Sequence, residues 1–201
     1  MTKQYGTITF PEFSNVRCLM MPYIQGDTTS VPDVYLSYRD IIDTVFVRKG
    51  DIGFLTIDES VAVEGKPHRG TRAKYARALH TEVGRPPGYV YWCWGGKLNV
   101  ILDRDVRILL ANNLDDSCAV WDAEHEDTSV DGDIGHVADD YPYSDATFLK
   151  AGEVHEIGIL TPHESLPVRE TVRRQFLRII SSGVHGREEY FTRNPLLELP
   201  Q

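Results

Sequence analysis

The residues His80-Thr81-Glu82 have the types and spacing that could bind a metal ion. In an extended chain, residues i and i+2 point to the same side, so this imidazole and this carboxylate can grip one ion together. Two later segments also carry reactive side chains. They are Thr161-Pro-His163-Glu-Ser165 and the basic run Arg173-Arg174-Gln-Phe-Leu-Arg178. Arg174 and Arg178 lie four residues apart, so we expect them to share one face of a strand.

This order of residues resembles that of the Fe(II)- and 2-oxoglutarate-dependent dioxygenases, whose fold is the double-stranded β-helix. Their pattern is His-x-Asp/Glu, several strands, a distal His, and then an Arg or Lys a short distance further on. The matching positions here are His80, Glu82, His163 and Arg174, and the resemblance covers roughly residues 78–182. The chain departs from the family at Glu82, where most members have Asp.

The resemblance implies that His80, Glu82 and His163 hold Fe(II), and that no other residue is needed for catalysis. Two imidazoles and one carboxylate occupy one face of an octahedral ferrous ion and leave positions open for 2-oxoglutarate and dioxygen. Arginine suits the far carboxylate of 2-oxoglutarate because its planar fork donates two parallel hydrogen bonds. This role falls to Arg174, with Arg178 as the substitute and the Ser165 hydroxyl as a further donor.

Two other histidines offer competing ligand sets. His125 and Asp127 have the same His-x-acid spacing, but the 35 residues between Asp127 and His163 leave room for too few strands to close a barrel. His155 follows a Gly turn in a segment similar to the second cupin motif, yet the chain has no His-x-His for the first motif. Two other functions therefore stay open. One is a cupin-type isomerase or epimerase that works without 2-oxoglutarate, and the other is a non-catalytic β-barrel binding protein.

Composition places the chain among ordinary globular proteins. It has 201 residues, 41% of them hydrophobic and 25% charged, with a formal charge of −9. This length suits a single domain, and the acidity makes a nucleic-acid partner unlikely. Three scattered cysteines build no disulfide framework, and no apolar run is long enough to cross a membrane. We therefore expect a cytoplasmic protein that acts on a small molecule and could form a homo-oligomer.

The elements that must position these residues are mostly short strands. Runs rich in β-branched and aromatic residues recur from residue 89 onward and predict a mainly β (α+β) fold. We expect a jelly-roll or cupin-like double-stranded β-helix over residues 76–182, an N-terminal α/β elaboration over 1–75, and a tail over 183–201. Apolar positions from Val34 to Phe46 predict one helix.

Two charged segments stand out between these elements. The acidic, Gly-rich stretch 122–145 predicts one long exposed loop. The stretch 66–77 has no acidic residue and contains five basic ones, namely Lys66, Arg69, Arg72, Lys74 and Arg77. It could be a solvated surface, or a cationic wall beside a site for a small anionic substrate.

Overall fold

A computed structural model describes residues 2–67, 76–84, 91–93, 96–98, 106–126, 132–181 and 191–197, with the backbone alone for residues 84, 91–93 and 96–98. Its strands are β1 (Lys3–Thr7), β2 (Arg17–Ile24), β3 (Ile52–Ala62), β4 (Leu79–His80), β5 (Val83–Gly84), β6 (Tyr91–Cys93), β7 (Gly96–Leu98), β8 (Arg107–Asn112), β9 (Cys118–Val120), β10 (Thr147–Phe148), β11 (Glu153–Gly158), β12 (His163–Ser165) and β13 (Val172–Ile180). The helices are η1 (Thr28–Ser30), η2 (Asp33–Tyr38), α1 (Arg39–Thr44), η5 (Gly135–Asp140) and η6 (Tyr143–Asp145). The fold is therefore mainly β.

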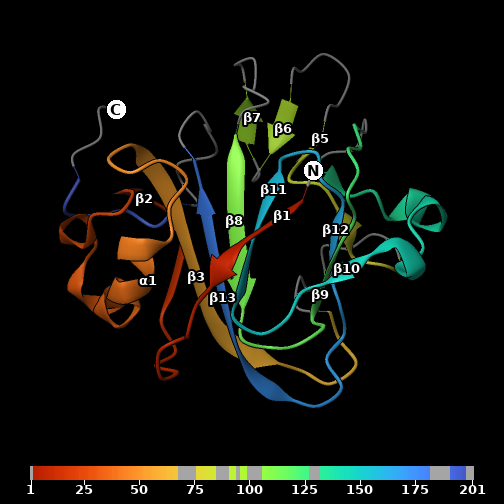
Figure 1. The fold of residues 1–201 in the computed structure, drawn as a ribbon, viewed down its shortest axis with the longest axis horizontal. Coiled ribbons are helices and arrows are strands. Elements are labelled where there is room, and N and C mark those ends of the chain that lie inside the picture. Colours follow the sequence, from red (N-terminus) through yellow and green to blue (C-terminus); the bar gives the residue numbers. More distant parts are fainter. Residues whose placement is uncertain are drawn as a thin grey trace.

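Two antiparallel sheets form the body of the molecule (Figure 1). The larger has the strand order β1-β11-β8-β13-β3-β2, and the smaller has the order β10-β9-β12-β4. Strands β5, β6 and β7 form a separate small sheet. Because β3 pairs with β13 along its whole length, the larger sheet spans the boundary that we expected between the N-terminal elaboration and the core.

The main core lies between the two sheets. Side chains from the larger sheet, such as Ile108, Leu110 and Ile157, pack there with Cys118 and Val120 of the smaller sheet. Because side chains alternate across a strand, every second residue of β8, β9, β11 and β13 faces this interior. The two arginine candidates on β13, Arg174 and Arg178, are an even number of residues apart and therefore lie on the same face.

The N-terminal helices cover the outer face of the larger sheet (Figure 1). The expected single helix is instead a 3-10 helix (η2) followed by an α-helix (α1). The buried residues of η2, Tyr35 and Tyr38, lie three positions apart, which matches the 3.0 residues per turn of a 3-10 helix. Val34 is 61% exposed, so its expected place on the buried helix face was wrong.

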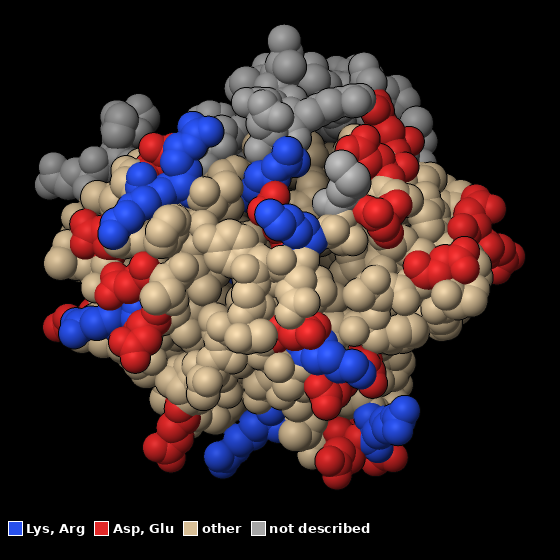
Figure 2. Space-filling model, in the orientation of Figure 1, with Lys and Arg blue, Asp and Glu red and all other residues tan. Residues whose placement is uncertain are grey.

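The acidic segment 122–145 is not one long exposed loop, as its composition predicted. Its described part contains η5 and η6, and Ile134 is fully buried against Leu79, Ala119 and Trp121 on the outer face of the smaller sheet. Apart from the buried Asp133, the described acidic residues of the segment lie on its solvent side. Figure 2 accordingly shows Asp and Glu gathered at the side of the molecule where η5 and η6 lie.

The C-terminal segment 191–197 lies along the edge strand β2. The Thr192 amide donates to the Leu19 carbonyl, and the Asn194 side chain donates to the carbonyl groups of Pro22 and Ser30. These bonds satisfy backbone groups that an edge strand otherwise exposes. No helix of the described residues is long and apolar enough to span a membrane.

A buried carboxylate joins the N-terminal segment to the larger sheet. Glu59 is fully buried, and it accepts hydrogen bonds from the Ser14 and Val16 amides, the Tyr38 hydroxyl and the Gln175 side chain. Burial by itself would raise the pKa of Glu59, but these four donors outweigh it and hold the pKa below its ordinary value of 4.5. The charged form of Glu59 therefore stabilises the fold.

We predict that Glu59→Gln lowers the free energy of unfolding at pH 7 by about 1–3 kcal/mol, because it removes hydrogen bonds to a charged acceptor. The contribution of Glu59 is present above pH 4.5 and is lost as the pH falls through the lower pKa of the folded state. Urea unfolding of both proteins from pH 7 to pH 3 should therefore show the gap closing in acid. The matched control Glu12→Gln, at an exposed site, should change little, and a gap independent of pH would refute the assignment.

Candidate metal centre

His80 and His163 are direct neighbours across two strands. They are paired residues of β4 and β12, and both side chains point toward the interior between the sheets. Their ring centroids lie 3.9 Å apart, as expected for paired residues on one face of an antiparallel ladder. The register of a two-residue strand thus brings together two imidazoles that are 83 positions apart in the chain.

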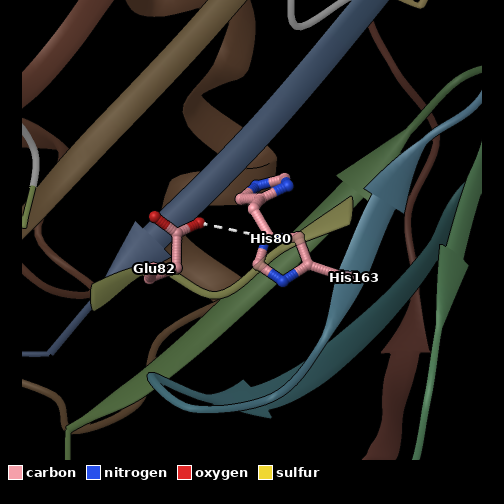
Figure 3. Close-up of side chains that lie close together, drawn as sticks. All are labelled: His80, Glu82 and His163. Carbon is pink, nitrogen blue, oxygen red and sulfur yellow. Dashed lines mark ion pairs between the residues drawn. The ribbon is translucent and has the colours of Figure 1, made fainter. Parts of the chain in front are cut away.

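Glu82 completes the cluster from the bend that follows β4 (Figure 3). Ligand atoms of His80, Glu82 and His163 all lie within 4.8 Å of one another, and this group could hold a metal ion. Glu82 and His163 are 7% and 5% exposed, and Glu82 Oε1 lies 3.3 Å from His163 Nε2. The structure therefore brings together the three residues that the sequence analysis proposed as ligands.

Hydrogen bonds determine which nitrogen of each imidazole is available to bind a metal. His80 Nδ1 lies 3.0 Å from the Ala78 carbonyl oxygen, and His163 Nδ1 lies 2.9 Å from the Thr161 carbonyl oxygen. A carbonyl oxygen can only accept, so each Nδ1 carries a proton, and Nε2 is the nitrogen of each ring that is left to bind a metal. Backbone acceptors of this kind orient histidines that bind metals, and the pair is therefore prepared to present two Nε2 donors.

The segment 132–134 holds the His80–Glu82 stretch from its other edge. The Thr81 amide donates to the Gly132 carbonyl oxygen (2.9 Å), and the Ile134 amide donates to the Leu79 carbonyl oxygen (3.2 Å). Gly132 has a φ of +67°, and a Cβ there would overlap the Thr81 carbonyl oxygen. Only glycine allows this close approach. Strand β4 is therefore hydrogen-bonded on one edge to β12 and on the other to a backbone segment that the sequence analysis assigned to an exposed loop.

The opposite face of β12 carries a separate ion pair. Arg77 donates to Glu164 Oε2 through Nε (2.9 Å) and Nη2 (2.7 Å), and through Nη1 to two carbonyl oxygens of the η5 segment. Its guanidinium also lies over the rings of Trp121 and Tyr143. Arg77 therefore docks η5 and η6 onto the smaller sheet and does not contribute to a cationic wall. Lys66 is exposed, and the expected positions Arg69, Arg72 and Lys74 lie outside the described residues.

The two proposed anion-binding arginines have different surroundings. Arg178, on β13, donates from Nη1 to both oxygens of Glu82 (3.0 and 3.1 Å). Arg174, four residues before Arg178 and on the same face of β13, is 4% exposed and stacks on Phe176. Within the described residues it has no hydrogen bond or ion pair, and its Nε is buried without an acceptor. Burial accordingly lowers the pKa of Arg174.

Ser165 lies two residues beyond His163 on β12 and is paired with Cys118. Its side chain is thus on the inward face, as the spacing predicted. The thiol of Cys118 is buried in the main core, where desolvation raises its pKa to about 12. Ser165 and Cys118 therefore line the same interior as His163, on the side where Arg174 acts on the Cys118 thiol.

The competing histidines have other contacts. His155 Nε2 lies 3.1 Å from Glu153 Oε2, and His125 Nδ1 lies 2.9 Å from the Tyr141 hydroxyl. Asp127 lies outside the described residues. Among the residues that the structure describes, neither histidine belongs to a group of three metal-binding side chains.

Comparison with protein-family models gives no match for this chain. No curated protein matches it either. Among solved structures, one titled "Crystal Structure of EvdMO1" is similar, with a TM-score of 0.35 and 12% identity over 76% of this chain and 31% of that chain. This chain thus spans about a third of the length of that structure. Likeness at this level assigns no activity, so functional inference rests on the geometry of the side-chain cluster.

We predict that Gly132→Ala weakens binding of Co(II) about 10-fold or more, because displacement of the 132–134 segment frees the backbone of His80 and Glu82. The matched control is Gly65→Ala, where φ is +70° and a Cβ would meet nothing within 4 Å. The left-handed backbone should cost both variants about 1–2 kcal/mol of stability, and the overlap with Thr81 should add to that cost in Gly132→Ala. Only Gly132→Ala should change the Co(II) titration, and equal Co(II) affinity in both variants would contradict the positioning role of Gly132.

Proposed function

We propose that this protein is an Fe(II)- and 2-oxoglutarate-dependent dioxygenase that hydroxylates or otherwise oxidises a small anionic substrate. The observation that carries the proposal is the convergence of His80, Glu82 and His163. Two histidines and one carboxylate are the donor set typical of non-haem Fe(II) oxygenases, which need open coordination positions. The donors of this chain come from one side, β4 and β12, and so fit that ion.

The path of the chain supports the double-stranded β-helix as the fold. The connections β3 to β4, β8 to β9, β10 to β11 and β12 to β13 each pass from one antiparallel sheet to the other. Crossings of this kind are what a double-stranded β-helix would require, and the small sheet β5-β6-β7 would then be an insertion between two of its turns. His80 and His163 then lie on strands of the smaller sheet, Glu82 follows directly after β4, and Arg174 lies on the facing sheet.

Arg174 supports the choice of a dicarboxylate as co-substrate. A buried cation without a partner is costly, so proteins seldom keep one without an anion to bind. Arg174 lies on the inward face of β13 and has no anionic partner among the described residues. The far carboxylate of 2-oxoglutarate would supply this partner, with two parallel hydrogen bonds from the guanidinium and a further donor from Ser165.

Each residue then has a defined part in the reaction. His80 and His163 would supply Nε2 donors and Glu82 a carboxylate oxygen, while Arg174 would orient the co-substrate toward them. When bound, the ferrous ion supplies the activation of dioxygen that couples decarboxylation of 2-oxoglutarate to oxidation of the substrate. Apolar side chains of the interior, among them Leu110, Val120 and Ile157, would exclude water from that chemistry. With Arg77 engaged by Glu164, the other basic residues of the stretch 66–77 are the sequence feature that favours an anionic substrate.

The proposal predicts ferrous-dependent turnover of 2-oxoglutarate to succinate by the purified protein, and its loss in His163→Ala. Anaerobic Fe(II) titration followed by exposure to dioxygen would measure both binding and succinate release. His155→Ala is the matched control, because His155 is also a buried histidine, and it should keep both properties. Loss of metal in His155→Ala with retention in His163→Ala would favour the cupin-type alternative, and metal-free wild-type protein would favour a non-catalytic role.

Arg174→Met should have opposite effects on stability and on co-substrate binding. Removal of an unpaired buried cation should leave the ligand-free protein as stable as the wild type or more stable by about 1–3 kcal/mol. The Kd for 2-oxoglutarate at saturating Co(II) should rise roughly 100-fold, since a bidentate charge-assisted contact is lost. Urea unfolding and calorimetric titration would measure the two effects. A stability loss together with normal 2-oxoglutarate binding would give Arg174 a structural role only.

A further inference from the structure

We propose that Arg178 is a positioning residue that holds the carboxylate of Glu82 in place as a metal ligand. This inference rests on the proposed function, because it gives Glu82 the role of a ligand. It assigns to Arg178 a task different from the anchoring of 2-oxoglutarate. Arg178 would act on the metal through Glu82 and would contact neither the metal nor the co-substrate.

The contact between the two side chains is close and shielded. Arg178 Nη1 lies 3.0 Å from Glu82 Oε1 and 3.1 Å from Oε2, and the side chains are 12% and 7% exposed. One guanidinium nitrogen therefore donates to both oxygens. At this burial, water competes weakly for the ion pair, so the contact restricts the rotation of the carboxylate.

Glu82 needs such a contact more than an aspartate would. It lies in the bend after β4, so the sheet fixes His80 and His163 but leaves the Glu82 side chain with an additional rotatable bond. A longer side chain has more rotamers to lose when it binds a metal. Arg178 selects the rotamer in which Oε1 faces His163 Nε2 at 3.3 Å, which is the arrangement that one metal ion requires.

A strained segment of β2 supports the other side of Arg178. Met20 has a φ of +50°, and the pairing of β2 with β3 shifts register between Cys18 and Met21. This irregularity turns the fully buried Met20 side chain inward, where its Sδ lies 3.6 Å from Arg178 Nη2. The Met20 amide donates to the Thr56 hydroxyl (3.1 Å), and Thr56 is the β3 partner of Arg178. Backbone strain that is kept in place in this way is common near functional sites.

The surroundings of Arg174 and Arg178 separate their roles. Arg178 is already engaged with a carboxylate of the chain, whereas Arg174 has no acceptor among the described residues. If Arg178 also bound the co-substrate, it would have to release Glu82 at the moment when the metal needs that ligand in place. The geometry therefore gives the co-substrate to Arg174 and the ligand carboxylate to Arg178.

A double-mutant cycle with Co(II) as the probe tests this inference. We expect Arg178→Met to raise the Co(II) Kd about 10–100-fold, in the range known for residues that orient metal ligands. Arg178→Lys should restore part of that loss. Glu82→Asp withdraws the carboxylate by one methylene group, beyond hydrogen-bonding reach of Arg178, so adding Arg178→Met to it should cost no more than about 2-fold. Calorimetric titration and the visible absorption of bound Co(II) would measure affinity and ligand geometry.

The co-substrate provides the second readout. At saturating Co(II), Arg178→Met should keep the wild-type Kd for 2-oxoglutarate within about 3-fold, in contrast to Arg174→Met. Co(II) binding in Arg178→Met that equals or exceeds that of the wild type overturns the inference and leaves the proposed function standing. Selective loss of 2-oxoglutarate binding would make Arg178 a co-substrate anchor. If the wild-type protein binds no Co(II), the proposed function and this inference fail together. If Arg178→Met does not fold, the Co(II) Kd values of Arg178→Lys and Glu82→Asp are compared instead, and they decide whether Arg178 positions Glu82.

Discussion

The candidate site depends on the register between two very short strands. His80 and His163 face each other because β4 and β12 pair at that position, and a slip of one residue would turn His163 outward and Glu164 inward. The outward residues resist this slip, since Glu164 is bound by Arg77 and Leu79 is packed against Ile134. The metal-binding face of the sheet is thus specified in part by contacts on its opposite face.

Charge is distributed unequally between the two sheets. One buried carboxylate, Glu82, faces Arg178, while Arg174 remains without a partner among the described residues. With a divalent cation added at Glu82, the interior would carry an excess of positive charge, which a dianionic co-substrate would reduce. A metal bound first would therefore strengthen the attraction of the interior for a dianion.

The sequence predicts the parts of this site that follow from local periodicity. Alternation along a strand relates His80 to Glu82, and Ser165 to His163, and runs of β-branched residues predict most of the strands. The pairing of His80 with His163 required the resemblance to a known family, because nothing local relates two residues so far apart. The contact between Arg178 and Glu82 joins residues 96 positions apart, and four-residue spacing on β13 could not reveal which arginine meets the carboxylate.

Composition misled where one segment has two different faces. The stretch 122–145 is acidic on its solvent side, yet Ile134 is buried and Gly132 grips Thr81. Averaged over the segment, these few inward residues are outweighed by the acidic ones, so the composition of the segment resembles that of a loop.

The partners of two arginines show why a structural role suffices for Arg77 but not for Arg174. Arg77 satisfies carboxylate, carbonyl and aromatic partners at once, whereas folding alone gives no reason to bury Arg174 without an anion.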